Sequence, residues 1–330
     1  MSELQSNDEP ACRICFEPGD SKPLTSPCPC RGSQRYVHDS CLLAAFQARA
    51  QWFELTCPTC RHSYEGPCAI LLAEAALHAV ELEEAASGSG HQKLGVALAN
   101  LGNAYGMAGQ HTQQRELLER ALALKEKEFG QDHHQVASTL VNLSIACGAT
   151  GATAESRTLL ERALPIQERE FGSDSEEVAI TLANLGLSCG RQGDHAAAVS
   201  FLERALRLFE NKFGSESLQV ASVLVNLGNS MGYLMKLGRK RELLQRALRI
   251  QEREYGREHR EVAITKFNLG KALHDLGDKA AAVELVEDAA VLFAQYFGRA
   301  DPNTASARKL AELCRARSDG PVKPWRVTVR

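Results

Sequence analysis

Cysteine and histidine residues gather near the N-terminus of this 330-residue chain. Seven of the eleven cysteines precede residue 61, with the spacing C-x2-C-x12-C-x-C-x7-H-x2-C-x15-C-x2-C. Structural Zn²⁺ prefers four thiolate or imidazole ligands in a tetrahedron. Eight such groups in four close pairs therefore predict two zinc ions. The candidate ligands are Cys12, Cys15, Cys28, Cys30, His38, Cys41, Cys57 and Cys60.

Disulfide formation explains these cysteines less well than metal binding does. The N-terminus lacks a basic segment followed by an apolar one, and no apolar run is long enough to span a membrane, so we expect a cytosolic or nuclear protein. Spaced cysteines in a reducing compartment indicate metal rather than disulfides.

The formal net charge of -3 argues against nucleic acid or a membrane as the main partner.

The ligand spacing resembles the RING-CH, or RING-variant, fingers of ubiquitin ligases. The short C-x-C, the gap before His38 and the string Cys-Arg-Gly-Ser at 30–33 carry the resemblance. It implies a cross-braced domain over residues 12–61. One ion would be held by Cys12, Cys15, His38 and Cys41, and the other by Cys28, Cys30, Cys57 and Cys60. The PHD finger, a histone-tail reader, shares the ligand order but usually has a wider second pair and a shorter gap before the histidine.

RING-type ligases position a ubiquitin-loaded conjugating enzyme and form no covalent intermediate with ubiquitin. The resemblance implies that Ile14 and Pro58 contact the conjugating enzyme. It also implies that Arg61 hydrogen-bonds both that enzyme and ubiquitin, a role that suits the planar guanidinium. Each residue has a simpler alternative, because Ile14 could pack its zinc turn, Pro58 could stiffen one and Arg61 could face solvent.

The finger departs from the family pattern at Ala45. The family usually has tryptophan at this position, four residues after the sixth ligand. Three nearby aromatic residues are candidates to fill the groove for the conjugating enzyme, namely Phe46, Trp52 and Phe53. Because zinc can contribute about 10–16 kcal/mol to folding, we expect a chelator to unfold residues 12–61 and leave the helical remainder intact.

Residues after the finger repeat with a period of 42, as in Phe129, Phe171 and Phe213, each followed by glycine. Each unit has the apolar pattern of two helices, the first over 136–148 in the second unit. A single helical hairpin cannot bury its apolar face, but stacked neighbours can. The sequence therefore predicts a mainly α protein, with an α-solenoid of five helix-turn-helix repeats over 91–298 after the finger.

The period and strings such as VNLGN and LERAL resemble tetratricopeptide repeats of the kinesin light chain type. That family binds peptide segments in a groove lined by a repeated asparagine. An amide can donate to and accept from a peptide backbone. The alternative role for the amides is packing between helices. The predicted ladder is Asn100, Asn142, Asn184, Asn226 and Asn268.

The flanking segments complete the predicted organisation. We expect a linker or capping helix over 67–86, a second capping helix over 304–317, and disorder over 1–11 and 318–330. Pro165 should kink its helix, because proline lacks an amide hydrogen. Met235 stands where other repeats have a turn glycine, so we expect a shifted turn there.

Two functions follow from this organisation. In the first, the protein is a RING-type E3 ubiquitin ligase whose finger recruits the conjugating enzyme and whose repeats bind substrate peptide. In the second, it is a non-enzymatic zinc-binding adaptor with a peptide-binding groove like that of kinesin light chains.

Overall fold

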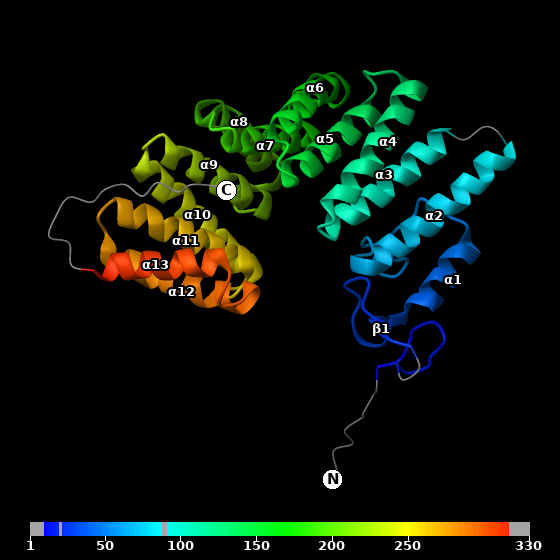
Figure 1. The fold of residues 1–330 in the computed structure, drawn as a ribbon, viewed down its shortest axis with the longest axis horizontal. Helices are drawn as coiled ribbons and strands as arrows, with labels where there is room; N and C mark the ends of the chain where they lie inside the picture. Colours follow the sequence, from blue (N-terminus) through cyan, green and yellow to red (C-terminus); the bar gives the residue numbers. More distant parts are fainter. Residues whose placement is uncertain (1–9, 20–21, 88–90, 317–330) are drawn as a thin grey trace, which may run out of the picture. The chain divides into compact units, whose positions relative to one another are not determined.

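The computed structural model describes residues 10–19, 22–87 and 91–316 (Figure 1). These residues are mainly helical and fall into two compact units that divide after Ile166. The predicted disordered ends lie outside the described residues except for Pro10 and Ala11, and Ala11 forms an isolated β-bridge with Pro18. In the described part of the chain, no helix has both the length and the apolar character needed to cross a bilayer.

The finger is built from short elements. Strands β1 (Leu24–Thr25) and β2 (Val37–His38) pair antiparallel, and the 3-10 helix η1 (Gly32–Gln34) lies between them in sequence. Helix α1 (Asp39–Arg49) follows β2 directly. Its buried residue Phe46 packs edge-on against the ring of Trp52, with 5.6 Å between ring centroids. Few large apolar side chains hold this region together, so bound metal must contribute much of its stability.

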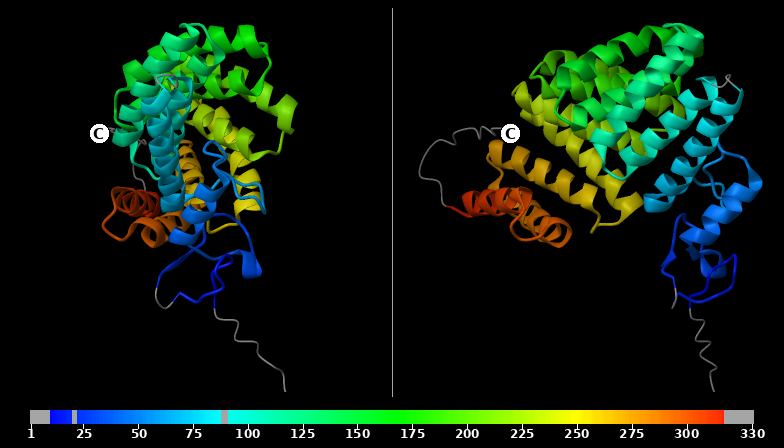
Figure 2. Two further views of the ribbon diagram at one scale, coloured as in Figure 1. Left: turned by 90° about the vertical axis from the view of Figure 1, so that its right-hand side faces the viewer. Right: turned by 45° about the vertical axis from the view of Figure 1, so that its right-hand side comes forward.

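Helix α2 (Gly66–Ser87) joins the finger to the first repeat. Its buried residues Leu72 and Ala76 belong to one apolar core with Phe46 of α1 and with Leu101 and Ala104 of the next helix, α3 (His91–Met107). Figure 2 shows α2 in cyan beside the blue finger. The finger is therefore packed onto the helical region rather than attached by an extended linker.

A partly buried polar cluster reinforces this junction. The hydroxyl of Thr25 in β1 donates to Asp39 Oδ1 at 2.9 Å, and the Cys68 thiol of α2 donates to the same oxygen at 3.1 Å. Burial raises the pKa of the Cys68 thiol to about 11, so the group keeps its proton and acts as a donor. Cys68 thus ties α2 to the finger without being a zinc ligand.

The repeats follow as successive helix pairs. The first unit continues from α3 with α4 (His111–Phe129) and α5 (His134–Ala149), and α6 (Thr153–Phe171) crosses the boundary between the units. The second unit contains α7 (Glu176–Arg191), α8 (His195–Phe213), α9 (Leu218–Tyr233), α10 (Leu237–Tyr255), α11 (Arg260–Asp275), α12 (Lys279–Phe297) and α13 (Pro302–Arg315). Helices thus occupy the two flanking ranges where capping helices were expected, as α2 and α13.

Repeated local signals fix the helix ends. The side chains of Ser175 and Ser217 accept hydrogen bonds from backbone amides at the starts of α7 and α9. His133 and His259 do the same through Nδ1 at the starts of α5 and α11. Helices α4, α8, α10 and α12 end at glycines with positive φ, for which the missing Cβ removes the steric cost.

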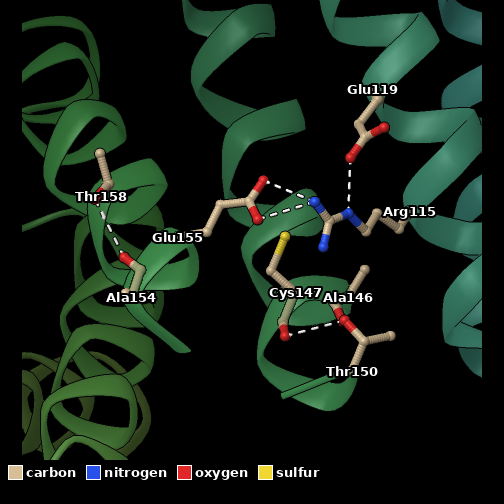
Figure 3. Close-up of polar contacts among 8 residues, drawn as sticks. All are labelled: Arg115, Glu119, Ala146, Cys147, Thr150, Ala154, Glu155 and Thr158. Carbon is tan, nitrogen blue, oxygen red and sulfur yellow. Dashed lines mark hydrogen bonds and ion pairs between the residues drawn. The ribbon is translucent and has the colours of Figure 1, made fainter. Parts of the chain in front are cut away.

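Polar side chains connect neighbouring repeats in the first unit (Figure 3). The Arg115 guanidinium of α4 bonds Glu119 one turn further along, and its Nη2 lies 2.9 Å from Glu155 of α6. Beside it, the Cys147 thiol of α5 is fully buried, and burial raises its pKa to about 11. This cysteine acts as a small core residue rather than as a nucleophile.

The expected shift of the turn at Met235 is wrong. Met235 has φ +60°, in the same left-handed region as the turn glycines Gly109 and Gly193. Its amide donates to the Gly232 carbonyl at 3.1 Å, as the Gly109 amide donates to that of Gly106 at 3.0 Å. The neighbouring helices therefore hold the turn in register, and methionine adopts the conformation that glycine has elsewhere.

The predicted kink at Pro165 concerns α6, which runs through this residue to Phe171. The boundary between the two compact units falls directly after Ile166, the next residue. Proline supplies no amide hydrogen to the carbonyl of residue 161, so the helix lacks one hydrogen bond at this point.

Candidate metal centre

The finger brings its eight predicted ligands together in two groups of four. In each group the ligand atoms all lie within 4.8 Å of one another. The groups are Cys12, Cys15, His38 and Cys41, and Cys28, Cys30, Cys57 and Cys60. This is the cross-braced pairing that the RING-CH resemblance implied.

The spacing of the ligand atoms fits tetrahedral zinc. Zn–S bonds of about 2.3 Å place two sulfurs about 3.8 Å apart, and a sulfur and a nitrogen about 3.6 Å apart. Cys30 Sγ lies 3.8 Å from Cys57 Sγ. In the other group, His38 Nδ1 lies 3.3 Å from Cys15 Sγ and 3.8 Å from Cys41 Sγ. Both groups therefore fit one Zn²⁺ ion each.

The surroundings of His38 select the nitrogen that would bind metal. Nδ1 faces the cysteine sulfurs, whereas Nε2 lies 3.3 Å from the Pro18 carbonyl oxygen. With Nδ1 as the ligand, Nε2 carries the proton and donates to that carbonyl. Such outer contacts orient ligating imidazoles and increase their basicity.

The two C-x-x-C turns share one backbone conformation. The amide of Phe16 donates to the Cys12 carbonyl at 2.8 Å, and the amide of Arg61 donates to the Cys57 carbonyl at 2.9 Å. Phe16 and Arg61 have φ of +63° and +62°, a region that side chains other than glycine rarely adopt. Each turn thus aims its two cysteines at one ion.

Hydrogen bonding and burial separate the thiol pKa values. Burial raises the pKa of Cys12 and Cys57, but hydrogen bonds from backbone amides, that of His38 among them for Cys12, outweigh this effect, and both pKa values fall to about 6. Burial and the neighbouring cysteines raise the pKa of Cys30 to about 12 and that of Cys41 to about 11. Each group therefore contains one cysteine that is a thiolate at neutral pH, and zinc binding must displace the proton of another thiol.

The predicted contacts for a conjugating enzyme lie at the surface of these turns. Ile14 is 39% exposed, and Pro58 and Arg61 are exposed as well. Ala45 is half-buried in α1. One suggested replacement for the missing tryptophan is wrong, because Phe46 is 1% exposed and belongs to the core.

Two other aromatic residues remain near the finger surface. Trp52 is half-buried against Phe46, and Phe53 is 41% exposed. Phe53 is therefore the better placed of these two for contact with a partner.

The asparagine ladder lies on the first helices of the repeats. Its five residues are half-buried on α3, α5, α7, α9 and α11. Among the hydrogen bonds found between described residues, none involves the side-chain amides of Asn100, Asn142, Asn184, Asn226 and Asn268. Within the described part of the chain, these amides remain available to a partner.

Asn226 also lines a cavity of about 230 Å³ between α7, α8 and α9. The rings of His195 and Tyr233 stack at its wall with 4.1 Å between centroids. Burial lowers the pKa of His195, which favours the neutral ring. Sequence alone does not predict this pair, although both residues vary between repeats and so depart from the shared pattern.

Family models agree with this architecture. The RING-variant domain matches residues 12–60. The tetratricopeptide repeat matches four overlapping segments, which together run from residue 96 to 295 and cover more than half of the chain.

Curated relatives resemble the finger. The E3 ubiquitin-protein ligase MARCHF11 from Homo sapiens is 41% identical over 56 residues, which are 17% of this chain and 13% of that protein. The E3 ubiquitin-protein ligase MARCHF4 from Danio rerio is 39% identical over 56 residues, again 17% of this chain and 13% of that protein. The chain thus spans about an eighth of the length of these relatives.

Solved structures resemble the helical region. BtubC (BKLC) from P. vanneervenii has a TM-score of 0.56 at 19% identity and covers 79% of this chain and 97% of its own. Nearly identical TPR-like repeats assigned to a kinesin light chain of Podosopora anserina give a TM-score of 0.53 at 23% identity, covering 63% and 97% of the two chains. At these identities the likeness concerns the fold alone.

Proposed function

Since the chain belongs to the tetratricopeptide repeat family and carries a RING-variant domain, we propose that it is a RING-type E3 ubiquitin ligase. The observation that carries the proposal is the finger itself. Two complete four-ligand groups lie beneath two turns that expose Ile14, Pro58 and Arg61. The relatives that share this finger are described as E3 ubiquitin-protein ligases.

In this proposal the finger acts by positioning. Zinc fixes the two turns and takes no part in the transfer. Ile14 and Pro58 contact the conjugating enzyme, and the Arg61 guanidinium bridges that enzyme and ubiquitin through its fork of donors. Holding the thioester in a reactive orientation lowers the entropic barrier to attack by a lysine. In this proposal the protein acts in the cytosol or nucleus, where cysteine thiols stay reduced.

The repeats supply the substrate surface. The half-buried amides of Asn100 to Asn268 make no hydrogen bonds among the described residues, and an extended peptide backbone offers both donors and acceptors to such groups. Because a peptide backbone carries no net charge, the surface of the repeats that binds it needs no net charge either. A protein segment bound along these first helices is therefore the proposed substrate.

An autoubiquitination assay over a panel of conjugating enzymes tests the finger. We expect activity with at least one enzyme, and its loss in Ile14→Ala and Arg61→Ala. Val291→Ala is the matched control, because Val291 is an exposed apolar residue of α12 outside the finger. Activity that survives both finger substitutions would overturn the assigned contacts.

A second candidate function rests on Ala45. A finger with a weakened conjugating-enzyme groove could serve as a non-enzymatic adaptor that displays a peptide-binding array. Lack of ubiquitination with every enzyme of the panel, from protein that retains two zinc ions, would favour this adaptor.

The groove has its own test. Selection of a displayed peptide library with the full chain should enrich sequences that bind the wild type. The same peptides should bind the double variant Asn142→Ala/Asn184→Ala at least tenfold more weakly, a loss of about 1.4 kcal/mol or more. Ser138→Ala, which alters an exposed side chain of α5, is the control. Equal affinity of all three proteins would reject the ladder.

A further inference from the structure

Arg13 connects the two ligand groups of the finger. It lies between Cys12 and Cys15 of the first group, yet its Nη1 lies 3.8 Å from Cys28 Sγ of the second. The same Nη1 donates to the Gln34 carbonyl at 2.8 Å. Its backbone amide donates to the Tyr36 carbonyl at 2.9 Å. The Gln34 carbonyl therefore holds the guanidinium beside the second group, and the Tyr36 carbonyl holds the backbone from which it extends.

The two groups differ in the charge that they would place in the interior. Zn²⁺ with three thiolates and a neutral imidazole carries one net negative charge, whereas Zn²⁺ with four thiolates carries two. In the four-cysteine group, Cys28 is 5% exposed and Cys57 is fully buried. A buried charge of this size is costly unless a partner of opposite sign lies beside it.

Arg13 supplies that partner. Its guanidinium stays protonated throughout the physiological range. Among the described residues, Arg13 is the only cationic side chain with a contact to a ligand sulfur within hydrogen-bonding range. Arg31 and Arg35 are nearby in sequence but exposed, and Arg35 lies over the ring of Tyr36 instead.

We propose that Arg13 is the counter-ion of the four-cysteine zinc centre and makes its zinc affinity depend on the first ligand turn. Arg13 is not itself a zinc ligand. It acts on the zinc centre through Cys28 and is thus a positioning residue. Because Cys12 and Cys15 fix the backbone on either side of Arg13, order in the first centre places the charge that the second centre needs. This inference does not depend on ligase activity.

Zinc transfer from the full chain to the chromogenic chelator 4-(2-pyridylazo)resorcinol tests the role of Arg13. We expect Arg13→Ala to release one of its two ions at least tenfold faster than the wild type, since outer-shell substitutions typically cost about 10–100-fold in metal affinity. Arg13→Lys keeps the charge and should stay within about threefold of the wild type. Arg35→Ala, the matched control on the same finger, should not change either release phase.

Cobalt substitution identifies the ion that leaves first. Four thiolates give stronger sulfur-to-cobalt absorption than three, so the fast phase of Arg13→Ala should carry the four-thiolate spectrum. If Arg13→Ala does not fold, Arg13→Gln decides, because glutamine keeps a polar side chain with amide donors but has no charge. Arg13→Gln should lose one ion quickly. Wild-type release from Arg13→Gln, or equal acceleration of both ions, would overturn the proposal.

Discussion

Met235 shows the cost of one residue in an unsuitable backbone conformation. It occupies the left-handed turn position that glycine has in the other repeats, and its side chain is 64% exposed. A side chain other than that of glycine costs about 1–2 kcal/mol in this left-handed region. Glycine would remove this strain, and its greater freedom in the unfolded chain would offset only part of the gain in stability. The turn is thus held by its neighbours against a local preference.

We therefore expect Met235→Gly to stabilise the protein by about 0.5–1 kcal/mol. Urea unfolding of the full chain measures the change. Leu234→Gly is the control, since Leu234 lies next to the turn without the left-handed conformation. A Met235→Gly variant that is less stable than the wild type would show that the methionine side chain contributes packing at this turn.

Lys240 shows the cost of a buried charge. Its side chain is 6% exposed, and the space beside it depends on Gly232, where an added Cβ would lie 2.7 Å from Lys240 Cδ. Burial, with a smaller contribution from the nearby Lys271 ammonium, lowers the pKa of Lys240 to about 8. At neutral pH the folded protein thus carries a charge that burial disfavours.

The sign of the pH dependence follows from this pKa. Between pH 8 and the ordinary value of 10.5 the unfolded chain binds more protons at this site, so stability rises with pH across that window. Lys240→Met should stabilise the protein at pH 7 by on the order of 1–3 kcal/mol, and the gain should shrink by pH 10. Urea unfolding at both values checks this, with the exposed Lys127→Met as control. An equal gain at the two pH values would contradict it.

At the scale of elements, the junction at α2 changes an expectation drawn from the sequence. Chelation was expected to unfold residues 12–61 alone. In the structure, Leu72 of α2 and Leu101 of α3 share the core of the finger, and the Cys68 thiol bonds Asp39 of α1. Elements that share one core unfold together more often than separately.

We therefore expect zinc removal to expose amides of α2 as well as those of the finger. Hydrogen exchange before and after chelation gives the measurement, with α11 and α12 of the second unit as internal controls. Loss of protection should be strong through the first turns of α2 and absent in the controls. Unchanged protection throughout α2 would show that the finger unfolds as an independent domain.

The elements also show what sequence could predict. The zinc ligands were predictable because each pair is close in the chain and its chemistry is specific. The repeated helices were predictable because the apolar pattern recurs every 42 residues. The contact of Arg13 with Cys28, the burial of Phe46 and the retained turn at Met235 depend on residues brought together by folding, so spacing alone did not reveal them.

At the scale of the whole molecule, the proposed activity divides between two kinds of surface. The finger presents Ile14, Pro58 and Arg61 at its zinc turns, and the first helices of the repeats carry asparagine amides that make no hydrogen bond among the described residues. In the proposed function, the first surface binds a conjugating enzyme and the second binds an extended protein segment. A ligase needs both, whereas an adaptor needs only surfaces that bind.

Single-turnover discharge of a ubiquitin-loaded conjugating enzyme onto free lysine tests the central claim most directly, because it isolates positioning from substrate binding. The full chain should accelerate discharge from at least one enzyme of a panel. Ile14→Ala and Arg61→Ala should remove the acceleration while two zinc ions per chain are retained, and the groove variant Asn142→Ala/Asn184→Ala should not affect it. Zinc-loaded protein that accelerates discharge from no enzyme of the panel would contradict the assignment as a ligase.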